Sequence, residues 1–224
     1  MISHSPRGTV RGRSGFTLLE LLIVIAIIAI LMALTAAASL RVLSEQPRRN
    51  TELLVRKLQQ AVDRQWTAAI DQAKRDRLSG NISRDQYVRT ALREEFPISL
   101  SEAQARYGPH VAGVQPPPVD GADSAICLYL ILGRARDGQE FNADIALGAA
   151  ALKDLDGARM VRMVIDGWGN PVSLVRAVDP SSPYGMQPVI VSPGPDGRLG
   201  LSRVDGRVLR EEDTYDNIDS RDFR

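Results

Sequence analysis

The sequence predicts an α+β protein, in which a long N-terminal transmembrane and amphipathic helix is followed by a globular head with a small antiparallel β-sheet. Three observations support this prediction. An apolar run near the N-terminus is long enough to span a membrane, an apolar stripe at helical spacing follows it, and three short runs rich in valine and isoleucine lie near the C-terminus. With 224 residues, 44% of them hydrophobic, the chain can build one folded domain besides the membrane segment.

The same patterns predict five segments along the chain, because hydrophobicity, charge and proline content change at their borders. They are a leader peptide over 1–15, a transmembrane helix over 16–40, an amphipathic helix continuing into the head over 41–80, a helical and loop insertion over 81–158, and a β-meander with an acidic C-terminal loop over 159–224.

The predicted membrane helix runs from Phe16 to Leu40 and contains 14 uninterrupted hydrophobic residues between Leu21 and Leu34. A helix of this length measures roughly 37 Å, more than the ~30 Å of a hydrocarbon core. Three arginines and no acidic residue precede it within the leader, which predicts a cytoplasmic N-terminus and an extracytoplasmic head.

Glu20 is the single charged residue between Phe16 and Leu40. A carboxylate in hydrocarbon costs about 2.5 to 3.5 kcal/mol, so its presence indicates a function. It can complement the helix dipole in the first turn, or it can meet a positive group of another chain. A secretory signal peptide cleaved near Ser39 is the alternative for this whole region, but it leaves Glu20 unexplained.

Beyond the membrane segment, the helix meets Pro47, where we expect a kink or a break, with Asn50 or Thr51 capping a restart. The restarted helix is predicted to end at Gly80. Its apolar stripe should pack under a sheet, with Trp66 in the same core. The stripe consists of Leu54, Leu58, Ala61, Val62, Ile70 and Ala73.

The insertion is predicted to be helical. Ser83 with Gln86 three residues later indicates a helix through about Phe96, and a second short helix should end at Gly108. The run at 124–132 fits a buried helix or a strand, and we favour a helix. Its Cys127, which has no second cysteine to pair with, is expected to be a buried apolar side chain.

Three runs predict the β-meander, at 159–165, 171–178 and 187–192. The first break is the sequence DGWGNP at 166–171, whose glycines permit a positive φ angle. Trp168 in this break is expected to cover the sheet edge or the core.

The stretch RSGFTLLELLIVIAIIAIL resembles the type IV prepilin cleavage and methylation motif, with Gly15, Phe16 and Glu20 at its defining positions. The resemblance implies that a prepilin peptidase of the inner membrane cuts between Gly15 and Phe16 and methylates the new amine. It also implies assembly of the chain with copies of itself in a filament. Glu20 would then pair with the terminal amine of a neighbouring subunit and set the register of assembly.

The C-terminal region carries a second resemblance. DGWGNP, VIVSPGPDGRLG and EEDTYDNIDS are together similar to the C-terminal half of the major pseudopilin of type II secretion, although LSRVDGRVLR replaces a shorter connection. The resemblance implies a calcium site, since calcium takes six to eight oxygen ligands; a solvated acidic loop is the alternative. The candidate ligands are Ser192, Asp196, Asp213, Asp216 and Asp219.

Three functions follow from these patterns. The first is a structural subunit of a periplasmic pseudopilus, with the other pseudopilins and the inner-membrane secretion platform as partners. The second is a surface pilus subunit, and the third is an exported soluble protein. We expect no enzyme, because no nucleophile with a base, phosphate-binding loop or Cys/His metal spacing occurs. We expect no nucleic-acid partner, because the net charge is +1 without a concentrated basic face.

Overall fold

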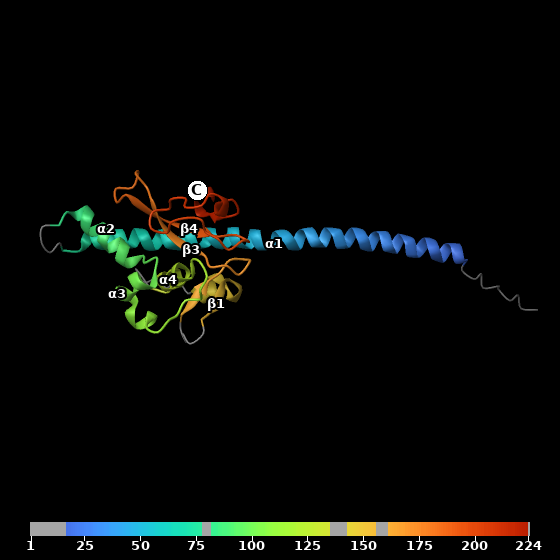
Figure 1. Cartoon of the computed structure of the whole chain (residues 1–224), viewed down its shortest axis with the longest axis horizontal. Helices are drawn as coiled ribbons and strands as arrows, with labels where there is room; N and C mark the ends of the chain where they lie inside the picture. The colour runs from blue at the N-terminus through green and yellow to red at the C-terminus, as the bar shows by residue number, and fades with distance from the viewer. Residues whose placement is uncertain (1–16, 78–81, 135–142, 156–160, 224) are drawn as a thin grey trace, which may run out of the picture. The chain divides into compact units, whose positions relative to one another are not determined.

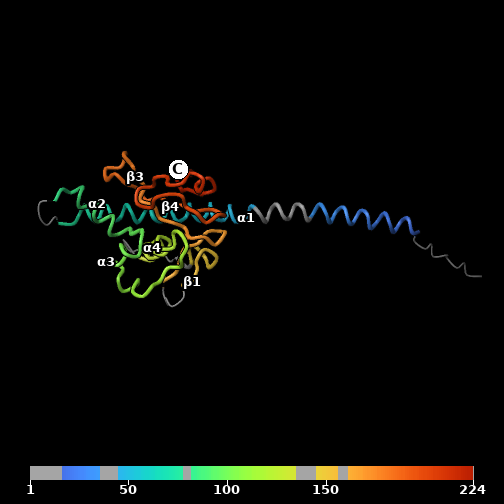
Figure 2. Tube along the Cα trace, viewed as in Figure 1, coloured from blue at the N-terminus to red at the C-terminus, as the bar shows by residue number. Residues whose placement is uncertain are grey.

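The computed structural model describes residues 17–77, 82–134, 143–155 and 161–223. The fold is α+β, as predicted: an apolar N-terminal helix and a head of helices with small antiparallel sheets. The chain divides into two compact units, residues 1–45 and residues 46–224, and the long helix α1 (Leu18–Arg75) contributes to both. Figure 2 traces the order of the elements along the chain.

In the first unit, α1 provides one helix that is long and apolar enough to cross a membrane, over Leu18–Thr35. The mean hydropathy of this window is 2.9, and none of it is buried within the protein. Its leucine, isoleucine and valine side chains are between 45% and 88% exposed. An apolar surface of this extent requires lipid or other helices around it.

The predicted break at Pro47 is wrong, because α1 continues through this residue. Thr51 is not the cap of a restarted helix; it is fully buried, and its hydroxyl donates to the Pro47 carbonyl at 2.8 Å. The same hydroxyl oxygen accepts the backbone N–H of Gly167 at 2.9 Å. A Cβ at Gly167 would lie 2.8 Å from the Pro47 Cα, so only glycine permits this approach. Packing of the head against the proline turn therefore offsets the helix hydrogen bond that proline removes.

The end predicted for this helix is also wrong. α1 stops at Arg75, whereas Gly80 lies outside the described residues. The Arg84 guanidinium donates to the carbonyls of Ala73 and Asp76, at 3.2 and 2.7 Å. A cationic side chain thus satisfies carbonyls at the helix end, a long-range capping that periodicity does not reveal.

The apolar stripe of α1 shares one hydrophobic core with Leu174 and Ile190 of the sheet, as predicted. Trp66 is buried and stacks at a tilt of 55° on Phe96, with the ring centroids 4.8 Å apart. Of the predicted stripe, Leu54, Leu58, Ala61, Val62 and Ala73 are buried and Ile70 packs partly buried against them.

The insertion is helical where the structure describes it. Its helices are α2 (Arg84–Glu95), α3 (Leu100–Val111), α4 (Ala122–Leu132) and the short α5 (Ala143–Leu147). Ser83 caps α2 by accepting the Gln86 N–H, as predicted. α3 does not end at Gly108 but bends at Tyr107 and continues to Val111, because Pro109 fits the first turn after a bend.

The favoured helical assignment of the apolar run at 124–132 is confirmed by α4. Cys127 within it is fully buried, also as predicted, and burial raises the pKa of its thiol to about 12. Ser124 fixes α4 to a strand, since its hydroxyl donates to the Leu174 carbonyl and accepts the Leu174 N–H, both at 2.9 Å.

The strands form two small antiparallel sheets, so the predicted meander is only partly confirmed. Its first run joins the second across the DGWGNP turn through an isolated antiparallel bridge between Ile165 and Pro171, but it belongs to a separate sheet. β2 (Arg162–Val164) pairs with β1 (Leu152–Asp154), a three-residue strand that the sequence analysis missed. β3 (Ser173–Val178), β4 (Met186–Ser192) and β5 (Ile218–Asp219) form the second sheet in this order. In β1 only Leu152 is buried, which leaves no alternating pattern to detect. Three short 3₁₀ helices complete the head: η1 (Ala149–Ala151), η2 (Glu212–Thr214) and η3 (Ser220–Phe223).

A buried amide joins α1 to the second sheet. The Gln59 side chain donates to the Pro188 carbonyl at 3.0 Å, and its oxygen accepts the Ile190 N–H at 3.0 Å. The same oxygen accepts the Ser220 hydroxyl of η3 at 2.6 Å. The C-terminal segment is therefore tied to the central helix by hydrogen bonds.

The segment at 201–210 covers the outer edge of β3. Arg176 and Val178 of β3 donate their N–H groups to the carbonyls of Arg203 and Asp205, at 2.9 and 3.0 Å. Leu201 pairs with Val208 across this turn. Covering an edge strand removes unpaired backbone groups that would otherwise invite aggregation.

Candidate assembly site

The first turn of α1 presents Glu20 at its capped N-terminus. The Glu20 N–H donates to the Thr17 hydroxyl at 3.2 Å, and the Leu21 N–H donates to the Thr17 carbonyl at 3.2 Å. Thr17 is thus the N-cap, and Glu20 occupies the third helical position. The Glu20 carboxylate is exposed and complements the positive end of the helix dipole. Thr17 was missed in the sequence, although T-x-x-E is the spacing of a capping box.

Gly15 and Phe16 lie outside the described residues. The geometry of the first turn of α1 nevertheless shows what a new amine at Phe16 would meet after a cut between these two residues. Such a cut leaves an amine on Phe16, one residue before the helix cap. Since the helix end is already positive, an ammonium there needs a nearby carboxylate. Glu20 is the single acid of the apolar segment, so an amine and an acid are available from each copy.

The two segments predicted to bind calcium lie side by side in the head. The Asp196 N–H donates to an Asp216 carboxylate oxygen at 3.3 Å, and the Asn217 amide donates to the Leu199 carbonyl at 2.8 Å. Gly194 lies so close to Asp216 that a Cβ there would be 2.9 Å from its Oδ2.

Three of the five predicted calcium ligands contact other side chains, and the carboxylates of the other two, Asp196 and Asp216, accept backbone N–H groups. The Ser192 hydroxyl donates to Asp166 at 2.7 Å, Arg221 holds Asp219 at 2.5 Å, and Asp213 lies 3.6 Å from the Arg198 guanidinium. Among the described residues, no three His, Cys, Asp or Glu side chains gather as a metal site. The side chains as placed therefore do not fit a carboxylate cage, although the side-chain oxygen of Asn217 is buried without a hydrogen-bond partner.

Calcium binding stays a prediction that a titration decides. If the loop binds calcium, millimolar calcium raises the melting temperature of the purified protein, because a ligand that binds only the folded state stabilises it. The Asp216→Asn variant should lose this rise. An unchanged melting temperature and no heat in a calorimetric titration would contradict calcium binding by this loop.

Asp166 organises the DGWGNP turn, a role that the sequence analysis missed. One carboxylate oxygen accepts the N–H groups of Trp168 and Asn170, both at 2.9 Å, and the other accepts the Ser192 hydroxyl at 2.7 Å. The Asn170 amide then donates to the Gly194 carbonyl at 2.7 Å. Burial raises the pKa of the Asp166 carboxyl, against the lowering effect of these hydrogen bonds. An acid followed by a glycine-rich turn was the available signal.

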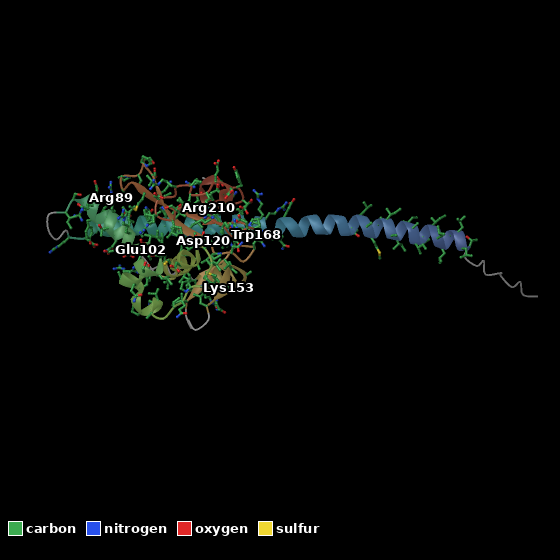
Figure 3. All side chains as sticks on the ribbon, in the orientation of Figure 1. Arg89, Glu102, Asp120, Lys153, Trp168 and Arg210 are labelled. Carbon is green, nitrogen blue, oxygen red and sulfur yellow. The ribbon has the colours of Figure 1, made fainter. Side chains whose placement is uncertain are left out.

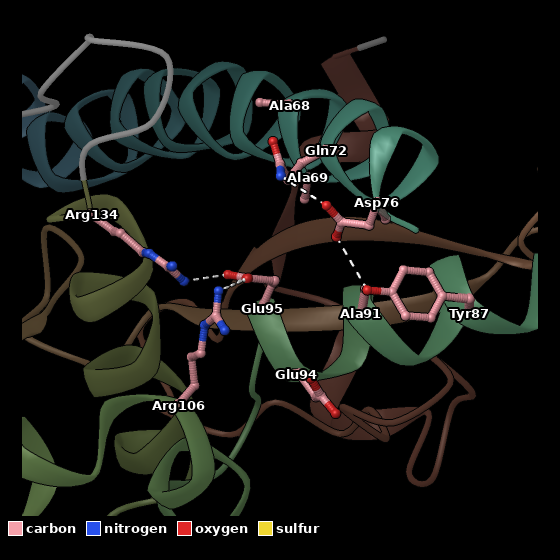
Figure 4. A pocket seen from close by; sticks show the side chains of 11 residues that line it. Ala68, Ala69, Gln72, Asp76, Tyr87, Ala91, Glu94, Glu95, Arg106 and Arg134 are labelled. Carbon is pink, nitrogen blue, oxygen red and sulfur yellow. Dashed lines mark hydrogen bonds and ion pairs between the residues drawn. The ribbon is translucent and has the colours of Figure 1, made fainter. Parts of the chain in front are cut away.

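A cavity of about 380 Å³ opens between α1, α2 and α3 (Figure 4). Alanines of α1 and α2 line it, and on one side the Glu95 carboxylate forms ion pairs with Arg106 and Arg134. Opposite it, the Tyr87 hydroxyl donates to Asp76 at 3.2 Å, and this contact raises the tyrosine pKa. These groups hold elements together, and none forms a nucleophile with an adjacent base.

Comparisons with known families agree with the N-terminal geometry. A model described as the prokaryotic N-terminal methylation motif matches residues 10–36, which include Gly15, Phe16, Thr17 and Glu20. Comparisons with curated proteins and with solved structures gave no match. The chain thus has the N-terminus of a type IV pilin-like subunit, of the kind that a prepilin peptidase processes.

Proposed function

We propose that this chain is a structural subunit of the pseudopilus of type II protein secretion. It is cleaved between Gly15 and Phe16 and methylated on the new amine, and it assembles through its N-terminal helix. The observation that carries the proposal is Glu20 in a capped first turn, within a matched prepilin motif and followed by an exposed apolar helix. The role is structural and not enzymatic.

The proposed location is the inner membrane before assembly and the periplasm after it. Arg7, Arg11 and Arg13 precede the apolar helix, and basic residues favour the cytoplasmic side. The head then faces the periplasm. The proposed partners are the prepilin peptidase, copies of this chain, the other pseudopilins and the inner-membrane secretion platform.

Two observations favour a pseudopilus over a surface pilus, the second candidate. Surface pilins are expected to close their C-terminal loop with a disulfide, which the single Cys127, buried in α4, cannot form. Hydrogen bonds hold the C-terminal segment here instead, from Ser220 to Gln59 and from Arg221 to Asp219. The resemblance of the DGWGNP region to major pseudopilins points the same way.

A deletion strain separates these two functions. Without the chain, we expect exported proteins to accumulate in the periplasm while surface pili and surface motility persist, because only the secretion filament is lost. The wild-type gene on a plasmid should restore secretion. Normal secretion together with the loss of surface pili would contradict the pseudopilus and favour the pilus.

A further inference from the structure

A groove of about 580 Å³ lies on the head along the first turns of α1 after Pro47. One wall is the helix, where Asn50, Leu53 and Lys57 share a face at spacings of three and four residues. Leu147 and Trp168 line it from α5 and the DGWGNP turn, and Trp168 is labelled in Figure 3. Leu53 is 60% exposed and adds an apolar side chain to the lining of the groove.

A second exposed apolar feature is built by the end of the segment at 201–210, which replaces the shorter connection, and by the residues that follow it. Val208, Leu209 and Tyr215 form this feature, which we name the C-terminal knob; Leu209 is 69% and Tyr215 79% exposed. The backbone beneath it is fixed, because the N–H groups of Leu209 and Arg210 both donate to the Gly200 carbonyl, at 2.8 and 3.2 Å. The knob is therefore a preformed surface.

The charges beside the groove and the knob are opposite. Lys57 at the groove is exposed, as are Glu211 and Glu212 between the apolar residues of the knob. None of the three makes an ion pair with another residue in the part of the chain that the structure describes. The arginines near the knob are already engaged, Arg207 with Asp205 and Arg210 with Asp213. The knob thus carries two exposed acids without an ion pair, and Lys57 is an exposed cation at the groove. Asp166 also lines the groove, but it is buried and accepts the Ser192 hydroxyl.

We propose that the C-terminal knob of one copy docks in the α1 groove of the next copy in the filament. Leu209 and Tyr215 would cover Leu53 and Trp168, and the acids at 211–212 would meet Lys57. This inference rests on the proposed function, because it adds a contact between heads to the assembly through the N-terminal helices. Its occupant is a second copy of this chain, since the chain itself carries the matching surface.

The placement of the two surfaces suits an open polymer. Ala150 and Ala151 of η1 also line the groove, and β1 follows η1 directly. The C-terminal segment and β1 lie on different sides of α1 (Figure 1). A copy can therefore use its groove and its knob at the same time with two neighbours. Such a heterologous contact leaves one groove and one knob free at the ends, which is the requirement for a growing filament.

Cysteine cross-linking in cells tests the contact. The full chain with Leu53→Cys and Leu209→Cys should give a ladder of disulfide-linked oligomers after mild oxidation. Each single variant should give none, because the contact does not bring identical residues together. Cys127 adds no background, since it is fully buried. Leu53→Cys with Val178→Cys is the matched control, because Val178 is 60% exposed but outside the knob.

Charge reversal tests the same contact independently. In the cross-linking strain, Lys57→Glu should lower the yield of oligomers about tenfold, the effect of losing a charge pair worth ~1.4 kcal/mol at an interface. Adding Glu211→Lys and Glu212→Lys to this variant should restore the yield. No restoration would overturn the charge-complementary contact.

The outcomes separate this inference from the proposed function. Sedimentable filaments that depend on Glu20, together with no Leu53–Leu209 ladder, would overturn the head contact alone. The absence of any such filament would overturn the proposed function and the head contact with it. A ladder as strong in the Val178 control as in the Leu209 pair would show non-specific collision and would also overturn the contact.

Discussion

The Glu20→Ala variant is expected to be exported, cleaved and methylated normally but to be absent from filaments. In the proposed assembly, the carboxylate of one copy meets the terminal amine of its neighbour in a medium of low dielectric. Removing one partner of such a pair leaves the other charge uncompensated, at a cost of about 3 kcal/mol or more. This corresponds to a fall of about a hundredfold in incorporation, measured as the ratio of sheared or sedimented subunit to membrane subunit.

A second variant separates assembly from helix capping. Thr17→Ala removes the hydroxyl that accepts the Glu20 N–H, which costs about 1 kcal/mol of helix stability, but it keeps the carboxylate. We expect this variant to be incorporated into filaments. Incorporation of Glu20→Ala at the wild-type level would show that Glu20 acts only on its own helix, and the assembly role would be lost.

The Asp166→Ala variant is expected to destabilise the head more than any surface change. It leaves the partly buried N–H groups of Trp168 and Asn170 and the buried Ser192 hydroxyl without their acceptor. Each unsatisfied buried group costs on the order of 1 kcal/mol or more, so we expect a loss of about 3 kcal/mol. For a head of this size the melting temperature falls by about 10 °C. Trp66 and Trp168 both lie in the head, so the fluorescence of the full chain in detergent reports this unfolding.

The Asp166→Asn variant is the matched control, and it also tests the charge. An amide oxygen can still accept both N–H groups, and the amide can donate to Ser192, so most of the stability should remain. Because burial raises the pKa of Asp166 in the folded state, this state holds the proton more tightly than the unfolded chain. The contribution of Asp166 to stability is therefore largest below the ordinary pKa of 3.8 and decreases as pH rises through the folded-state pKa.

The asparagine variant should lack this component of the pH dependence. The measurement is the difference in melting temperature between the wild type and Asp166→Asn at several pH values above 3.8. A difference that does not change with pH would contradict a raised pKa of Asp166.

Local signals in the sequence were sufficient for much of the fold. The stripe from Leu54 to Ala73 repeats at helical spacing, and Ser83 with Gln86 marks the start of α2, because helix faces and caps are set by near neighbours. The apolar run of α4 was ambiguous from periodicity alone, because a helix that is buried on nearly all sides has no polar face to show its period.

The features that could not be predicted depend on partners far away in the chain. α1 passes Pro47 because Gly167 packs on that turn, and it stops at Arg75, where Arg84 binds the last carbonyls. β1 is a strand only because β2 pairs with it. At the candidate site, the motif indicated Glu20, whereas the partner of Ser192 proved to be Asp166. Such pairings depend on tertiary contacts, which residue spacing does not encode.

The most direct test of the central claim is the N-terminus of the mature protein. Intact mass spectrometry and terminal sequencing of the protein recovered from membranes should show a chain that begins at Phe16 and carries one methyl group on its amine. A chain that begins upstream of Gly15, or among the alanines near Ser39, would contradict processing by a prepilin peptidase and with it the filament.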